Sequence, residues 1–211
     1  LLDGLEIAGE NQALQRSYFF LLLRQGRLEK AERLMREQFG DSVETLPENM
    51  QQYYYFQKGM ISLAAEDFDA ARNFFENAIR DDFDQTWDGE QIMYATILSA
   101  LHRQAGNTVL AEQRLASAER LVRRARINGV DDAGIYYMES SIHALRGEIQ
   151  DALDSLQMAY ERGFREVWIL EIDLRLESLH DTPQFIAIKQ QIEKDIVQAR
   201  TEVESFALAA R

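Results

Sequence analysis

The segment that decides the fold is AEDFDAARNFFENA, residues 65–78, because its order of small and large residues recurs at a fixed distance along the chain. Ala71 lies within it, and the equivalent alanines Ala31, Ala71, Ala111 and Ala152 are spaced by 40, 40 and 41 residues. They lie in RQGRLEKAERLM (24–35), AEDFDAARNFFENA, QAGNTVLAEQRLASA (104–118) and LRGEIQDALDSLQMA (145–159). A fixed period of this size is typical of stacked structural units rather than of one irregular globule.

Each recurring segment predicts the second helix of a helical hairpin. A polar or glycine turn precedes the alanine by five residues, a large apolar residue follows it by four, and usually a small residue follows it by seven. In the second segment the apolar residues keep the three- and four-residue spacing of one helix face: Phe68, Ala71, Phe74, Phe75, Ala78 and Ile79. Strict two-residue alternation is nearly absent from the chain, so we expect no β-sheet.

The composition favours long helices and a soluble acidic surface. The 211 residues are 46% apolar, include only two prolines and carry a net charge of -13. Such a charge disfavours nonspecific binding to nucleic acid or to an anionic membrane. The chain has no cysteine, which excludes disulfides and thiolate metal sites. The longest apolar run, Tyr18 to Leu23, is far shorter than the roughly 20 residues that a membrane span needs.

Four helix pairs are expected over residues 1–163, followed by a C-terminal capping helical region over residues 164–211. Gly26, Gly106 and Gly147 mark turns inside three of the pairs. The expected helices are Asn11 to Gln25 and Leu28 to Phe39, Glu48 to Ala64 and Phe68 to Arg80, Glu90 to Ala105 and Val109 to Ile127, and Ile135 to Leu145 and Ile149 to Arg162.

The four units resemble tetratricopeptide repeats, in which small and large residues alternate across two antiparallel helices. The second unit matches best, with Gly59, Ala71, Phe75 and Ala78 at the small, small, large and small positions. The first unit is degenerate. The remaining matches are Ser99, Ala111, Leu115 and Ala118 in the third unit, Ser140, Ala152, Leu156 and Ala159 in the fourth, and Ala31 and Met35 in the first, where Phe19 and Gln38 replace two small residues.

The resemblance implies an all-α fold, a right-handed solenoid of helical hairpins with C-terminal capping helices. The period of 40 or 41 residues exceeds the usual tetratricopeptide length of about 34, so the helices or links are longer here. Another helical-hairpin repeat of longer period is the alternative.

The last fifth of the chain resembles the segment that closes the repeat region of many bacterial multidomain proteins. These proteins include winged-helix transcriptional regulators, often membrane-anchored, and some nucleotide cyclases. Thr182 departs from the pattern's acidic residue but can cap a helix that begins at Pro183. The residues that match the pattern are Trp168, Asp173, Leu179, Pro183 and Phe185. The other departures from it are Leu174, His180 and Gln184.

The resemblances imply a protein–protein interaction module rather than an enzyme. We expect the regulatory or sensory C-terminal region of a larger bacterial signalling or transcription-regulatory protein, and the chain starts at Leu1 rather than at a methionine. The alternatives are a free-standing adaptor or scaffold and the accessory domain of an enzyme such as a nucleotide cyclase. A membrane span before Leu1 would place the repeats in the periplasm, and otherwise we expect them in the cytoplasm. The sequence leaves open whether the chain forms a homodimer, and we do not expect nucleic acid as a partner.

No residue pattern predicts a catalytic site, a cofactor or a metal ion. His102 and His143 lie 41 residues apart, at equivalent places in successive units, and Glu139 is the nearest further ligand. Two histidines without a clustered third ligand favour a packing role. The one basic patch has two interpretations, a solvated helix face and a docking site for an acidic partner; it comprises Arg120, Arg123, Arg124 and Arg126.

The resemblance implies that the first helix of each pair lines a concave groove. Aromatic, methionine and arginine side chains are common anchors of protein interfaces, so we expect a partner of apolar and acidic character. Alanine at Tyr53 and Phe56 is expected to abolish binding and to leave the melting curve nearly intact. The expected groove residues are Arg16, Phe20, Arg24, Tyr53, Phe56, Met60, Met93, Thr96, Arg103, Tyr137 and Ser141.

Overall fold

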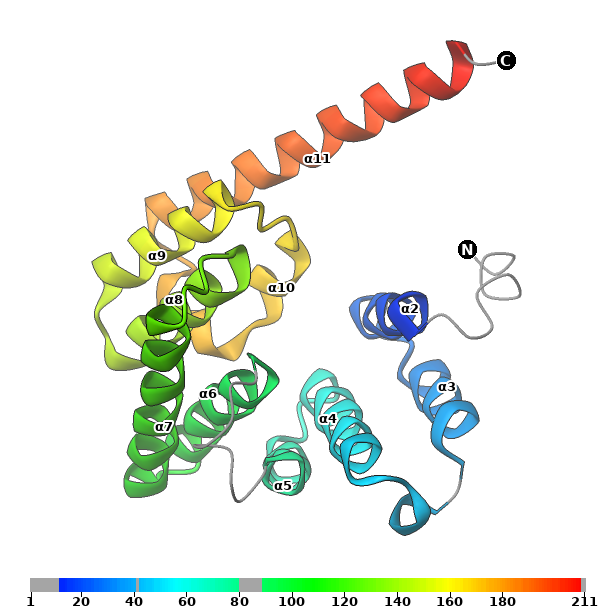
Figure 1. Ribbon diagram of the computed structural model, residues 1–211, viewed down its shortest axis with the longest axis vertical. Helices are drawn as coiled ribbons and strands as arrows, with labels where there is room; N and C mark the ends of the chain where they lie inside the picture. The colour runs from blue at the N-terminus through cyan, green and yellow to red at the C-terminus, as the bar shows by residue number, and fades with distance from the viewer. Residues whose placement is uncertain (1–11, 41, 80–88, 210–211) are drawn as a thin grey trace. The chain divides into compact units, whose positions relative to one another are not determined.

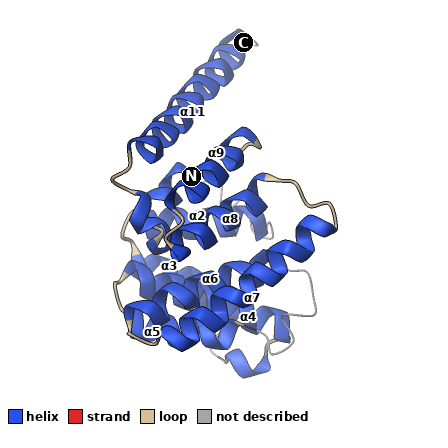
Figure 2. Ribbon diagram, turned by 90° about the vertical axis from the view of Figure 1, so that its left-hand side faces the viewer, coloured by secondary structure: helices blue, strands red, loops and turns tan. Residues whose placement is uncertain are grey.

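The computed structural model describes residues 12–40, 42–79 and 89–209, and over these ranges the chain is helical, with no strand (Figure 2). The prediction of an all-α fold is confirmed for these residues. The chain divides into two compact units, Leu1–Arg80 and Asp81–Arg211. The expected boundary between hairpins and cap, after residue 163, lies inside the second unit. No helix in the described ranges combines the length and the apolar character needed to cross a membrane.

The described part of the first unit, residues 12–40 and 42–79, forms the α-helices α2 to α5 and a short 3-10 helix (Figure 1). Helix α4 packs against α3 and, more extensively, against α5, its hairpin partner. Gly26 turns the chain between α2 and α3 with a φ of 65°, which a residue without a Cβ adopts at little cost. The elements are α2 (Gln12–Arg24), α3 (Leu28–Phe39), η1 (Val43–Thr45), α4 (Glu48–Ala64) and α5 (Phe68–Ala78).

The second unit contains two long hairpins, α6–α7 and α8–α9, followed by the C-terminal segment. The 3-10 helix η3 packs on α6, α8 and α9, and α11 packs on α9 and α10. Thr182 Oγ1 accepts a hydrogen bond from the Phe185 N–H at 3.3 Å, which confirms the predicted cap of the helix that begins at Pro183. The elements are α6 (Gly89–Gln104), α7 (Thr108–Ile127), α8 (Ala133–Arg146), α9 (Ile149–Glu161), α10 (Val167–Ile172), η3 (Leu174–Leu179) and α11 (Pro183–Ala209).

Every helix predicted for the four pairs is present, and its described ends lie within two residues of the prediction. The predicted ends at Asn11 and Arg80 lie outside the described residues. The agreement follows from strong local signals. Glycines with positive φ end several helices, and Asp67 and Asp132 cap α5 and α8 through their carboxylates.

The recurring alanines lie where the two helices of a hairpin approach closely. Ala31, Ala71 and Ala152 are fully buried, and Ala111 is nearly so. In the second hairpin, the small residue on the first helix is Gly59. A Cβ added at Gly59 would lie 2.7 Å from Cε2 of the buried Phe75 ring. Serines take this place in the next two hairpins, Ser99 and Ser140, and both are fully buried.

We expect alanine to destabilise the second hairpin at Gly59 and to be tolerated in the fourth at Ser140. Overpacking against Phe75 costs about 1–3 kcal/mol, and the better helix propensity of alanine returns about 1 kcal/mol. The Ser140 hydroxyl has no hydrogen-bond partner among the described residues, so its removal is expected to raise local stability by about 1 kcal/mol. Amide hydrogen exchange in α4–α5 and in α8–α9 measures both effects. Equal effects of the two substitutions would contradict the size requirement at Gly59.

Candidate functional site

The expected groove residues of the first unit meet in one aromatic cluster. The Arg16 guanidinium lies 6.0 Å from the Phe20 ring, whose centroid is 6.2 Å from that of Phe56. The Tyr53 ring stacks on Phe56 at 6.1 Å. Helices α2 and α4 supply these side chains, and the two helices pack directly against each other. The structure thus brings together four of the six expected groove residues of this unit.

The six expected groove residues of the first unit differ in how much of each side chain is exposed. Arg16 and Arg24 are exposed, while Phe20, Tyr53 and Met60 are partly buried against the core of the unit. Phe56 is only 1% exposed and packs on Phe20, Tyr53 and Phe75. The expectation that alanine at Phe56 leaves stability intact is therefore wrong, because the truncation would open a cavity in the core.

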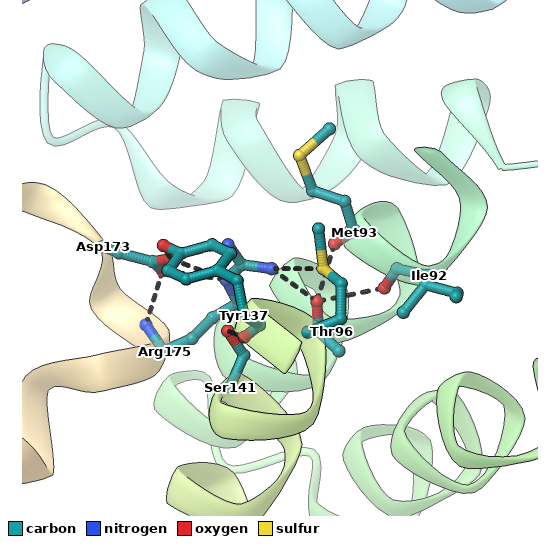
Figure 3. Close-up of polar contacts among 8 residues, drawn as sticks. Ile92, Met93, Thr96, Tyr137, Ser141, Asp173 and Arg175 are labelled. Carbon is teal, nitrogen blue, oxygen red and sulfur yellow. Dashed lines mark hydrogen bonds and ion pairs between the residues drawn. The ribbon is translucent and has the colours of Figure 1, made fainter. Parts of the chain in front are cut away.

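In the second unit, the chain's own segment η3 packs on α6 and α8, the helices that carry the expected groove positions. Thr96 of α6 and Tyr137 and Ser141 of α8 are all buried. Figure 3 shows Arg175 reaching from the C-terminal segment to Tyr137 and Thr96. Thr96 and Tyr137 contact the C-terminal segment, and none of the three positions lines an open surface.

Asp173 and Arg175 form the centre of this contact. Arg175 Nε and Nη2 donate to the two Asp173 oxygens at 2.8 and 2.6 Å, and both side chains are buried. Arg175 Nη1 donates to Thr96 Oγ1 at 2.8 Å, and the guanidinium lies 5.4 Å from the Tyr137 ring. The Tyr137 hydroxyl donates to Asp173 Oδ2. A bidentate arginine–carboxylate pair with further hydrogen bonds is the arrangement in which a buried ion pair is best compensated.

Local geometry places the two charges. Asp173 caps η3, since its Oδ1 accepts the Arg175 backbone N–H at 3.0 Å, and this contact fixes the carboxylate beside the guanidinium. On α8, Tyr137 stacks on Phe164 with ring centroids 4.8 Å apart, which fixes its hydroxyl. Thr96 Oγ1 lies 3.0 Å from the Ile92 carbonyl and 2.9 Å from that of Met93, so it can donate backward along α6 while it accepts from Arg175.

The charges shift the titration of the buried groups. Burial alone would raise the pKa of Asp173, but the Arg175 charge and the hydrogen bonds from Arg175 and Tyr137 outweigh burial and lower it. Burial and the Asp173 charge raise the pKa of the Tyr137 hydroxyl well above its ordinary value. At neutral pH the network therefore holds a carboxylate, a guanidinium and a neutral phenol. The arrangement is suited to fixing a segment in place.

The remaining expected groove residues of the second unit have other contacts. Arg103 donates to the Leu145 carbonyl and, at 3.0 Å, to Glu112, so it connects α6 with α7 and with the end of α8. Met93 is partly buried. Arg103 therefore stabilises the packing between neighbouring hairpins.

The arginine cluster of α7 is divided between structure and solvent. Arg126 binds Glu139 at 2.9 Å and Asp131 at 3.3 Å, and its guanidinium lies 4.1 Å from the Tyr136 ring. Arg123 and Arg124 are exposed. Arg120 donates to Ser117 at 2.7 Å on its own helix. The patch thus presents a smaller basic surface than its four arginines indicate.

His102, His143 and Glu139 do not form a common group of ligand atoms among the described residues. His102 is buried in α6, whereas His143 Nδ1 lies 2.6 Å from Glu148 Oε2 across the α8–α9 turn. Ligand atoms of His143, Glu148 and Asp151 lie within 4.8 Å of one another, the one such group among the described residues. The hydrogen bond between His143 and Glu148 accounts for the approach of the first two side chains.

Sequence reasoning missed Arg175. Asp173 is part of the resemblance of the C-terminal segment, but no role was assigned to the arginine two residues later. The available signal is a pair of opposite charges inside the apolar stretch VWILEIDLRLESL, residues 167–179. Charged residues are rarely buried unless they are paired, so an Asp–x–Arg motif between Ile172 and Leu176 favours an internal ion pair.

Comparison with protein-family models, with curated proteins and with solved structures finds no match to this chain.

Proposed function

We propose that the chain is a tetratricopeptide-like module, a right-handed solenoid of helical hairpins that binds a protein segment along the first helices of its hairpins. The buried alanines at a period of 40 or 41 residues support the repeat assignment. The small residues Gly59, Ser99 and Ser140, at equivalent places on first helices, support it further.

The observation that carries the binding role is the segment seated on α6 and α8. These are the first helices of their hairpins, and η3 contacts both of them. Arg175 engages Thr96 and Tyr137, two positions that the resemblance assigns to the groove. The first helices of the second unit thus hold an irregular segment through a charged anchor, which is the interaction expected of a peptide-binding repeat.

In the first unit we assign partner binding to the partly exposed residues of the aromatic cluster. Phe20, Tyr53 and Met60 are partly exposed apolar side chains, and the Arg16 guanidinium lies beside the Phe20 ring. Arg24, also expected in the groove, is exposed in the last turn of α2. A protein segment with large apolar residues next to acidic ones fits this combination. Tyrosine and arginine are enriched among residues that dominate binding energy at interfaces.

Selection of displayed random peptides on the full chain tests this assignment. We expect the enriched peptides to combine aromatic or leucine residues with aspartate or glutamate. The double variant Tyr53→Ala/Arg24→Ala should weaken their binding by at least about tenfold, since loss of an interface anchor costs more than about 1 kcal/mol. Fluorescence polarisation with a labelled selected peptide measures the change.

Arg123→Ala is the matched control on the exposed part of α7, and it should change the affinity by less than about twofold. Equal binding by the wild type and the double variant would overturn the assignment to the first unit. Loss of binding in Arg123→Ala alone would move the partner site to the arginine patch.

For the parent protein we propose a regulatory role in bacterial signalling, on the resemblance of residues 164–211 to the segment that closes such repeat regions. The alternatives are a free-standing adaptor and an accessory domain of an enzyme. Mass spectrometry of the native protein tests these alternatives: a winged-helix DNA-binding region in the same chain supports the proposal, a cyclase region supports the enzyme, and a chain with neither region supports the adaptor.

A further inference from the structure

We propose that the turn between α8 and α9 binds a zinc ion through His143, Glu148 and Asp151. Ligand atoms of the three side chains lie within 4.8 Å of one another. His143 lies in the last turn of α8, Glu148 precedes α9 at its N-cap position, and Asp151 lies in the first turn of α9. One imidazole and two carboxylates are thus gathered at a single turn of the fourth hairpin.

Backbone hydrogen bonds fix the chain on which the three ligands stand. The Glu148 N–H donates to the His143 carbonyl at 2.9 Å, and the Gly147 N–H donates to the Ala144 carbonyl at 3.0 Å. These are the two bonds of a Schellman turn, and Gly147 supplies its left-handed residue with a φ of 78°. Asp151 follows Glu148 by three residues, so the two side chains are neighbours on the surface of α9. The turn therefore holds the backbone of all three ligands in place without an ion.

The charges at this turn are unbalanced. His143 Nδ1 lies 2.6 Å from Glu148 Oε2 and is the one base shared by two carboxylates. Within the described ranges, no hydrogen bond or ion pair joins the Asp151 carboxylate to another residue. Arg146, the other basic residue in the last turn of α8, pairs with two glutamates of α7 instead. A divalent cation between the carboxylates would balance their charge.

The donor set favours zinc over calcium or magnesium. Calcium and magnesium prefer oxygen ligands alone, whereas imidazole together with carboxylates suits zinc. Zinc with bonds of about 2.0–2.2 Å in a tetrahedron holds its ligand atoms about 3.3–3.6 Å apart. The three side chains must therefore close by about 1 Å, which they can do because Glu148 and Asp151 are exposed and His143 is only partly buried. A water molecule would complete the four ligands.

The imidazole of His143 gives binding at this turn its own spectroscopic signature. A carboxylate only accepts hydrogen bonds, so Nδ1 carries the ring proton in the contact with Glu148. Nδ1 faces the carboxylates, and zinc bound to this atom requires the proton on Nε2 instead. Nitrogen-15 NMR of the imidazole side chains should therefore show His143 changing its tautomer when zinc is added, while the buried His102 keeps its own.

Isothermal titration calorimetry with zinc chloride tests the site on the full chain, without a histidine tag and in a buffer that does not bind metal. We expect one zinc ion per chain with a dissociation constant below about 100 μM. Asp151→Asn replaces a charged ligand by a neutral amide and should weaken binding at least about tenfold. Asp154→Asn is the matched control, since it removes the same charge from an exposed position of the same helix, and it should weaken binding less than about twofold.

Two results would overturn the proposal. Zinc that binds only at millimolar concentration, or equally well to His143→Ala, is an adventitious ion only. Equal losses in Asp151→Asn and Asp154→Asn would show attraction by the acidic surface in place of a defined site. Circular dichroism checks that each variant is folded. None of these results bears on peptide binding by the first unit, because all three ligands lie in the second unit.

Discussion

Replacing Arg175 by methionine is expected to lower the free energy of unfolding of the second unit by about 3–5 kcal/mol, the usual cost of removing one partner of a buried ion pair. The substitution keeps an apolar stem of similar length but leaves the Asp173 carboxylate buried without its guanidinium. It also removes the donor to Thr96. Amide hydrogen exchange over residues 167–182, together with urea denaturation, measures the loss.

The double variant Asp173→Asn/Arg175→Met is the matched control. It removes both charges, so no uncompensated carboxylate remains, and the double variant should be more stable than Arg175→Met alone. A loss below about 1 kcal/mol in the single variant, typical of an exposed pair, would contradict a buried and essential contact.

The Asp173–Arg175 pair also makes the stability of the second unit depend on pH in the acid range. The folded-state pKa of Asp173 is lowered, so the stabilisation from its ionised form is fully present above the ordinary aspartate pKa of about 3.9. It is lost as the pH falls below that value toward the folded-state pKa. Asp173→Asn should flatten this part of the stability profile, and an unchanged slope would assign the acid sensitivity to other carboxyl groups.

Replacing Phe75 by alanine is expected to destabilise the first unit by about 3–5 kcal/mol. Phe75 is fully buried, lies against the site of Gly59 and contacts the Phe56 ring at 6.2 Å. Truncation would leave a cavity between α4 and α5 that close helix packing cannot easily fill. Hydrogen exchange of the α4 and α5 amides measures the effect.

The neighbouring Phe74 is the control for this prediction. It is the same residue type on the same helix, but it is only partly buried and lies under the Lys58 ammonium at 5.9 Å. Phe74→Ala should cost about 1 kcal/mol or less, mainly through loss of partial burial and of the cation–π contact. Similar losses of stability at Phe74 and Phe75 would contradict the assignment of Phe75 to the large position of the repeat pattern.

The hairpins were predictable because their signals are local. Apolar spacing, glycine turns and capping aspartates each act within a few residues, so the helix bounds agree with the sequence to within two residues. The second-unit surface was not predictable in the same way. Thr96 and Arg175 meet across 79 residues, and no periodicity in the sequence encodes that contact.

Whether an expected groove residue is exposed depends on which other parts of the chain pack over it. Thr96 and Tyr137 lie on first helices as expected, but both are buried and contact Arg175 of the C-terminal segment. Phe56 has the residue type of an interface anchor and is instead part of the core, because aromatic side chains serve both roles. Spacing alone assigns a residue to a helix face, whereas its exposure depends on distant parts of the chain.

If α6 and α8 bind segments of other proteins, as we propose, η3 competes with those segments from within the same chain. A segment joined by a short linker acts at an effective concentration in the millimolar range. A free peptide of equal intrinsic affinity would have to exceed that concentration to replace η3. Under the proposed role, we expect weak, abundant segments to be excluded and only a ligand that binds α6 and α8 far more tightly than η3 does to exchange with it.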